Sequence, residues 1–125
     1  MNTQFILVDD SKLDLMVFEK MLKSTLNVNE VMSFQFPEKA IDYLSSRTND
    51  KQTIIFLDIN MPVINGFLFL KLFENLPSSQ TNQTEIYIVT SSQNHIDHTR
   101  SKESMYVKGV ITKPISALSI SNIFA

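Results

Sequence analysis

Residues 54–57 read Ile-Ile-Phe-Leu, and Asp58 follows directly. An uninterrupted apolar run of this length is typical of a strand buried on both faces, as in a parallel sheet covered by helices. Short, mainly apolar runs recur along the chain. The five predicted strands are Phe5 to Val8, Val31 to Phe34, Ile54 to Leu57, Ile86 to Val89 and Val107 to Ile111. Their spacing leaves room for a helix between successive strands, which indicates an α/β fold.

The first intervening stretch predicts a helix over Lys12 to Leu26, with Ser11 as its N-cap. Met16 and Met21 fall near its apolar stripe, so we expect both to pack in the core. A second helix should run from Pro37 to Leu44.

Three further segments complete the predicted architecture. Residues 67–73 should form a helix that Pro77 brings to an end, and the polar segment 78–84 predicts a surface loop. Residues 96–105 have a thin apolar face and predict a marginal helix. The last segment, residues 115–125, predicts a short final helix.

Five strands that alternate with helices require right-handed crossovers and a doubly wound, five-stranded parallel sheet. The strand order 2-1-3-4-5 is one of two common solutions, and it makes strands 1 and 3 neighbours. Ligands of such sheets bind outside the carboxyl ends of the strands, at the switch point. The site is therefore expected after the strands 5–8 and 54–57.

Composition narrows the possible functions. The 125 residues suit one domain. The formal charge of −2, from 11 basic and 13 acidic residues, does not indicate a surface that binds nucleic acid. The chain has no cysteine, which excludes disulfides and zinc thiolates and fits a cytoplasmic protein. No apolar stretch approaches the roughly 20 residues that cross a bilayer. The N-terminus lacks the pattern of a signal peptide.

Polar residues follow four of the predicted strands. They are Asp9 and Asp10, Asp58, the pair Thr90 and Ser91, and Lys113 before Pro114. Neighbouring strands lie about 4.8 Å apart, so carboxylates after strands 1 and 3 should approach closely and repel. A hard cation relieves such repulsion. Mg²⁺ fits best, because it takes only one or two protein carboxylates and bridges to phosphate oxygens.

These residues suit phosphoryl transfer. A carboxylate beside a metal can attack phosphorus and form an aspartyl phosphate. The hydroxyl of Thr90 and the ammonium of Lys113 are suitable donors to the equatorial oxygens. Each residue alone would more often cap a helix or solvate a loop, and only their coincidence at one edge indicates phosphoryl transfer.

The chain resembles a response-regulator receiver domain of the stand-alone, chemotaxis-regulator-like type, with a flavodoxin-like (βα)5 fold. The resemblance rests on Val8-Asp9-Asp10, on Leu57-Asp58-Ile59-Asn60-Met61-Pro62 with Asn65-Gly66, on Thr90-Ser91 and on Lys113-Pro114, in this order. It implies one receiver domain over residues 1–125, with no output domain in this chain. It also implies a phosphoprotein of a two-component phosphorelay.

The resemblance implies a role for each site residue. Asp58 is the expected phosphoacceptor, with Thr90 and Lys113 as its catalytic partners. Asp9, Asp10, Asp58 and the backbone carbonyl of Asn60 are the expected Mg²⁺ site. Asn60 and Ser92 match positions that tune autodephosphorylation. The domain would then catalyse its own Mg²⁺-dependent phosphorylation and autodephosphorylation without being a conventional turnover enzyme.

The expected partners are a histidine kinase or a histidine phosphotransfer protein, and a downstream protein that binds the face formed by residues 96–105, strand 107–111 and helix 115–125. One residue departs from the family. Val110 stands where an aromatic residue usually precedes the lysine by three positions. Tyr106 cannot replace it, because four strand residues span about 13 Å.

Other functions remain open. The absence of the aromatic residue favours a phosphorylation-independent receiver-like interaction module. A phosphatase of the haloacid dehalogenase type would need a second Asp where Asn60 stands, and flavin binding would need a Ser/Thr/Gly-rich loop after the first strand. His95 and His98 have no further His or Cys beside them in the sequence, so they indicate surface residues and not a metal site.

Overall fold

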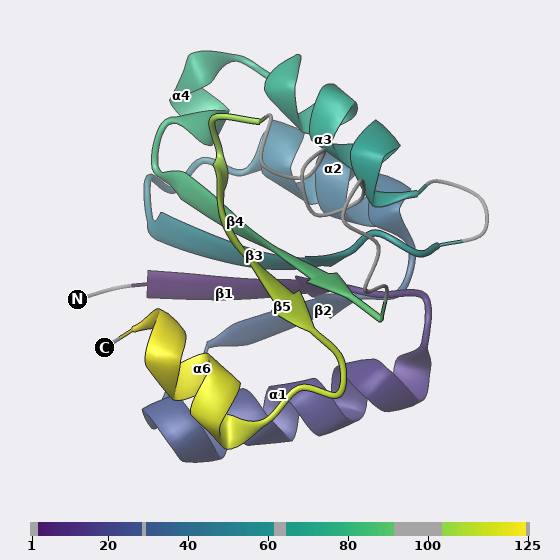
Figure 1. Ribbon diagram of the computed structural model, residues 1–125. Helices are drawn as coiled ribbons and strands as arrows, with labels where there is room; N and C mark the ends of the chain where they lie inside the picture. Colours follow the sequence, from purple (N-terminus) through teal and green to yellow (C-terminus); the bar gives the residue numbers. More distant parts are fainter. Residues whose placement is uncertain (1–2, 29, 62–64, 92–103, 125) are drawn as a thin grey trace.

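The fold is built on a five-stranded parallel sheet with the order β2-β1-β3-β4-β5, as predicted (Figure 1). The computed structural model describes residues 3–28, 30–61, 65–91 and 104–124. The strands are β1 (Thr3–Val8), β2 (Val31–Phe34), β3 (Gln52–Asp58), β4 (Thr84–Thr90) and β5 (Val107–Thr112). The helices are α1 (Lys12–Leu26), α2 (Pro37–Ser46), α3 (Gly66–Glu74), α4 (Ser78–Thr81) and α6 (Ala117–Ile123).

Helices cover both faces of the sheet. Figure 1 shows α1 and α6 against one face and α2 and α3 against the other. Alternate strand residues enter two separate cores: Ile55 and Leu57 pack toward α2 and α3, whereas Ile54 and Phe56 pack toward α1 and α6. Burial on both faces is the reason why the central strands are continuously apolar.

Helix α1 begins and ends where the sequence predicts. Ser11 caps it, because its hydroxyl accepts a hydrogen bond from the amide of Asp14 at 3.2 Å. The prediction for Met16 is wrong: this residue is 51% exposed, since it lies one residue past the buried Leu15 and is rotated away from the core. Met21 is partly buried and packs against the core on this face.

The prediction of a loop over residues 78–84 is wrong in part, because Ser78–Thr81 form helix α4 and Thr84 begins β4. Arg47, which is buried, stabilises this segment. Its guanidinium donates a hydrogen bond to the carbonyl of Gln80 at 3.1 Å, and the Gln80 side chain donates one back to the carbonyl of Arg47 at 3.2 Å. These contacts join residues more than 30 positions apart in the chain.

Arg47 also binds the start of three strands. Its guanidinium donates to Thr53 Oγ1 at 2.6 Å, Gln4 Oε1 at 3.3 Å and Thr84 Oγ1 at 3.5 Å. These partners are neutral oxygen atoms. Burial lowers the pKa of Arg47, and the nearby Tyr43 opposes that change only partly. The amino-terminal edge of the sheet is thus organised around one buried guanidinium.

The last two predicted helices have different outcomes. Residues 96–103 of the helix predicted over 96–105 lie outside the described residues, and Ser104 and Met105 form a turn before β5. The final helix is confirmed as α6, which Ser116 caps through the amide of Ser119. None of the helices described is long and apolar enough to cross a membrane.

Gly66, the first residue of α3, has no room for a side chain. A Cβ atom there would lie 2.6 Å from both Cα and Cγ2 of Ile59. The amide of Gly66 donates a hydrogen bond to the carbonyl of Ile59 at 3.2 Å, and Asn65 caps the helix through the amide of Leu68 at 2.9 Å. The glycine therefore lets α3 start against the segment that follows β3.

We predict that Gly66→Ala lowers the free energy of unfolding by about 1–3 kcal/mol, because the methyl group displaces backbone atoms of Ile59. Gly109→Ala is the matched control: its Cβ would meet the Tyr87 ring at 3.3 Å, and a ring can move more readily than a backbone. We expect a change of less than about 1 kcal/mol for the control. Equal losses in chemical denaturation would contradict the steric explanation.

Candidate functional site

The predicted acidic residues meet at the carboxyl edge of the sheet. β1 and β3 are paired in parallel with Val8 opposite Leu57, so Asp9 and Asp58 leave adjacent strand ends. Carboxylate oxygens of Asp9, Asp10 and Asp58 all lie within 4.8 Å of one another. Asp9 and Asp58 are buried and Asp10 is exposed. The strand order brings these carboxylates together.

Backbone amides orient the two buried carboxylates. The amide of Ser11 donates to Asp9 Oδ1 at 2.9 Å, and the amide of Asn60 donates to Asp58 Oδ1 at 3.0 Å. In each case the donor stands two residues after the acid, as in an Asx turn. One oxygen of each carboxylate is thereby held in place.

The ammonium of Lys113 lies among three carboxylates. Its Nζ is 3.1 Å from Asp9 Oδ2, 3.2 Å from Asp14 Oδ2 and 3.6 Å from Asp58 Oδ2. The backbone of Lys113 is fixed as well, because its amide donates to the carbonyl of Thr90 at 2.8 Å. Strand β5 therefore delivers a positive charge to acids that come from β1, β3 and α1.

Thr90 ends β4 and is fully buried at this edge. The side-chain amide of Asn60 donates to Thr90 Oγ1 at 3.3 Å, which links the loop after β3 to the end of β4. Ser91 is exposed, whereas Pro62 and Ser92 lie outside the described part of the chain. The predicted residues Asp9, Asp10, Asp58, Asn60, Thr90 and Lys113 thus all lie at one edge.

Burial and charge change the pKa of two groups. Burial, with the neighbouring Asp9 charge, raises the pKa of Asp58 to about 6, although the Asn60 amide and Lys113 oppose this. Burial alone would disfavour the Lys113 ammonium, but Asp58 and Asp9 outweigh it and raise the pKa of Lys113. At neutral pH a mainly ionised Asp58 therefore lies beside a fully charged Lys113.

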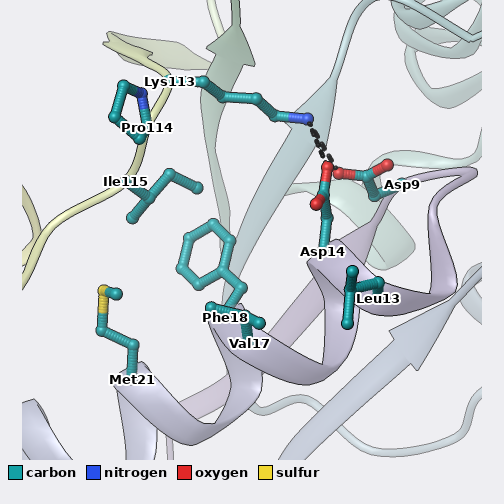
Figure 2. A pocket seen from close by; sticks show the side chains of 9 residues that line it. All are labelled: Asp9, Leu13, Asp14, Val17, Phe18, Met21, Lys113, Pro114 and Ile115. Carbon is teal, nitrogen blue, oxygen red and sulfur yellow. Dashed lines mark hydrogen bonds and ion pairs between the residues drawn. The ribbon is translucent and has the colours of Figure 1, made fainter.

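An apolar groove of about 500 Å³ opens beside Lys113, between α1 and the segment 113–115 (Figure 2). Its lining residues are Asp9, Leu13, Asp14, Val17, Phe18, Met21, Lys113, Pro114 and Ile115. Leu13 and Val17 are 69% and 52% exposed. The groove joins an apolar surface directly to the charged site.

Asp14 is not among the residues predicted for this site. A signal was available, because Asp14 stands three residues after the N-cap Ser11, in the first turn of a helix that begins at the site edge. A helix that leaves this edge must place its first turn beside the strand ends. The contact with Lys113 nevertheless joins residues 99 positions apart, and no local pattern predicts it.

The donor set suits a hard divalent cation. Its three acids, Asp9, Asp10 and Asp58, offer carboxylate oxygens, and two of these acids are buried. Among the residues described, Lys113 is the lysine in contact with the two buried acids. Such oxygen-rich, incompletely balanced sites favour Mg²⁺ over softer metals. The exposed Asp10 leaves one side open to water and ligand.

The raised pKa of Asp58 predicts how stability depends on pH. Between about pH 4 and pH 6 the native protein retains a proton that the unfolded chain has released, so metal-free protein should lose stability as pH rises through this window. Asp58→Asn should therefore be more stable than wild type by about 1–3 kcal/mol at pH 7. At pH 4 the two should be nearly equal. Denaturation curves with chelator test this, and a difference independent of pH would contradict it.

Comparisons with known proteins identify the family and the fold of the chain. Residues 5–124 match the response regulator receiver domain family. A response regulator receiver protein from Dyadobacter fermentans has a similar structure, with a TM-score of 0.88, 28% identity and coverage of 98% of this chain and 94% of that one. A two-component response regulator from Cytophaga hutchinsonii gives a TM-score of 0.81, with 26% identity and coverage of 98% and 93%.

A curated relative, stress response regulator protein 1 from Clavispora lusitaniae, is 39% identical over 62 residues, which make up 50% of this chain and 31% of that protein. The chain matches about a third of that relative's length. The family match spans nearly the whole chain, and the sheet order and the strand-end acids agree with it. This chain belongs to the response regulator receiver domain family.

Proposed function

We propose that this receiver domain accepts a phosphoryl group on Asp58 in a two-component phosphorelay and signals by binding a partner protein. The observation that carries the proposal is the position of Asp58: it is 4% exposed, lies beside two further carboxylates and has Lys113 Nζ 3.6 Å from its Oδ2. A structural aspartate at a strand end needs no such neighbours. A phosphoacceptor does, because phosphoryl transfer depends on positioning and charge neutralisation.

The donor in this proposal is a phosphohistidine of a histidine kinase or a histidine phosphotransfer protein. An Asp58 carboxylate oxygen attacks phosphorus, the P–N bond breaks, and its electron pair stays on the imidazole, which takes up a proton. The hydrogen bond from the Asn60 amide holds Oδ1 of Asp58, so Oδ2, which faces Lys113, is the oxygen that attacks. With a pKa of about 6, the carboxylate is mainly ionised at neutral pH.

Asp9, Asp10, Asp58 and the backbone carbonyl of Asn60 would hold Mg²⁺. When bound, the metal supplies positive charge for the equatorial oxygens of the transferring group. Lys113, which follows the carboxyl end of β5, supplies the second positive charge. Thr90 contributes a buried hydroxyl, whose oxygen accepts a hydrogen bond from the side-chain amide of Asn60 at 3.3 Å.

The apolar groove beside Lys113 supports docking of the phosphodonor protein. Exposed Leu13 and Val17 offer a surface that a partner can bury, and this surface adjoins the reacting carboxylate (Figure 2). Buried apolar contacts at the centre of an interface usually carry most of its binding energy. Leu13 and Val17 would therefore position the donor, whereas Asp9 and Lys113, which also line the groove, would take part in the chemistry.

The signal should leave the domain through β5, α6 and the segment 96–105. β5 is an edge strand that joins Lys113 to this surface, and a hollow of about 440 Å³ lies between β5 and α6. Val110 is partly buried against the core, and the Tyr106 hydroxyl is held 3.0 Å from Thr81 Oγ1 at the other end of the strand. Activation should then act through Thr90 and its loop and not through an aromatic ring.

Incubation with acetyl phosphate tests the proposal. Intact mass spectrometry should show one phosphoryl adduct that requires Mg²⁺ and is absent from Asp58→Asn. Asp42→Asn, which changes an acid of α2, should be phosphorylated like wild type. A Mg²⁺-dependent adduct on Asp58→Asn would relocate the acceptor. The absence of any adduct on wild type would favour a phosphorylation-independent interaction module.

We predict that Val17→Glu slows transfer from a phosphorylated histidine phosphotransfer domain by about tenfold, because a charge would be buried against the donor. Transfer from acetyl phosphate should remain at the wild-type rate. Met16→Glu is the matched control, since Met16 is equally exposed, at 51%, on the same helix but does not line the groove. Equal slowing by both substitutions would argue against docking in the groove.

A further inference from the structure

Asp14 binds the same ammonium as the reacting acids, although it comes from a helix and not from a strand end. Its Oδ2 lies 3.2 Å from Lys113 Nζ, and Figure 2 shows both side chains reaching toward each other at the mouth of the groove. This distance is shorter than the 3.6 Å between Lys113 and Asp58. Lys113 is therefore bound more closely to Asp14 than to the carboxylate that it should serve.

Asp14 does not belong to the metal-binding group. The carboxylates that share one small volume are Asp9, Asp10 and Asp58. Among the contacts of the described residues, the Asp14 carboxylate is engaged with Lys113 alone, while its own backbone amide is held by Ser11. Asp14 thus acts on the site through the lysine.

The single ammonium of Lys113 is shared among Asp9, Asp14 and Asp58, so a stronger contact with one acid weakens its contacts with the others. A phosphoryl group on Asp58 adds about −1.5 to −2 charges and three acceptor oxygens, and these attract the ammonium. Asp14 competes for the same N–H donors. The Asp14 side chain is 51% exposed, so water can solvate it when the lysine leaves. Replacing the Asp14–Lys113 ion pair by hydration therefore costs little free energy.

We propose that Asp14 is a positioning residue that, beside the 3.1 Å contact with Asp9, draws Lys113 toward α1 in the resting domain and limits its contact with Asp58, and that it releases the lysine when a phosphoryl group arrives. The proposal rests on phosphorylation at Asp58. It explains why a carboxylate from α1 meets the lysine at a site that already has three acids. Asp14 then sets how readily the domain becomes phosphorylated. A phosphodonor protein that contacts α1 can change how Lys113 is shared between Asp14 and Asp58.

The test compares Asp14→Asn, Asp14→Glu and Glu74→Gln with wild type. Asparagine keeps the size of the side chain and removes its charge, and glutamate restores the charge. Glu74, at the far end of α3, controls for the loss of one negative charge elsewhere on the protein. Phosphorylation rates with acetyl phosphate and with phosphoramidate, which carries less negative charge, are measured at low and high salt. The half-saturating concentration of beryllofluoride, with Mg²⁺, is a second readout.

Asp14→Asn should be phosphorylated about two- to fivefold faster at low salt, by the same factor with both donors, and should bind beryllofluoride more tightly. The factor should shrink at high salt, because the ion pair is half exposed. Asp14→Glu should return the rate toward wild type, and Glu74→Gln should not change it. A purely structural role would alter thermal stability without this dependence on salt.

Two results would overturn the proposal. If wild type is phosphorylated and Asp14→Asn has the same rate at low salt, Asp14 has no positioning role, although phosphorylation at Asp58 stands. If Asp14→Asn is faster only with the more highly charged donor, the carboxylate acts by repelling the donor and not through Lys113. A wild-type protein that takes up no phosphoryl group would remove both this proposal and the function on which it rests.

Discussion

The ammonium of Lys113 compensates negative charge that the fold concentrates at one edge. Asp9 and Asp58 are both buried there, and two buried carboxylates this close would otherwise repel and take up protons. Burial is the main reason why the pKa of Asp58 is raised, and Lys113, which also contacts Asp9 and Asp14, opposes this only in part. The excess of negative charge at this edge favours binding of a cation. It also means that a new group on Asp58 could change which acids Lys113 contacts.

The apolar cores hold this charged edge together. β1 and β3 are neighbours because helices must cover both faces of a doubly wound sheet, and each face buries its own set of strand side chains. The burial of apolar side chains therefore holds the carboxylates of Asp9 and Asp58 close together although they repel each other. Gly66 serves the same arrangement, since it lets α3 start directly against Ile59, the residue after Asp58.

Much of the fold and the site was predictable because their signals are local. The apolar runs located all five strands, the N-cap Ser11 marked the start of α1, and the rule on strand ends located the acids and Lys113. The failures depend on contacts distant in sequence. Arg47 donates a hydrogen bond to Gln80 of the short helix α4, 33 positions away, and Asp14 contacts Lys113, 99 positions away. Met16 was misassigned because one residue along a helix is enough to turn a side chain from the core to water.

Buried polar groups at the two ends of the sheet are paired in different ways. At the amino-terminal end, Arg47 is surrounded by neutral oxygen atoms that it holds by hydrogen bonds, whereas the carboxyl end depends on ion pairs. Ionic strength and acidity act mainly on ion pairs, so they should affect the carboxyl-end site and the partly exposed Lys51–Glu30 pair more than the buried Arg47 cluster. A tether or fusion partner joined near the Arg47 cluster would therefore leave the charged site at the carboxyl end undisturbed.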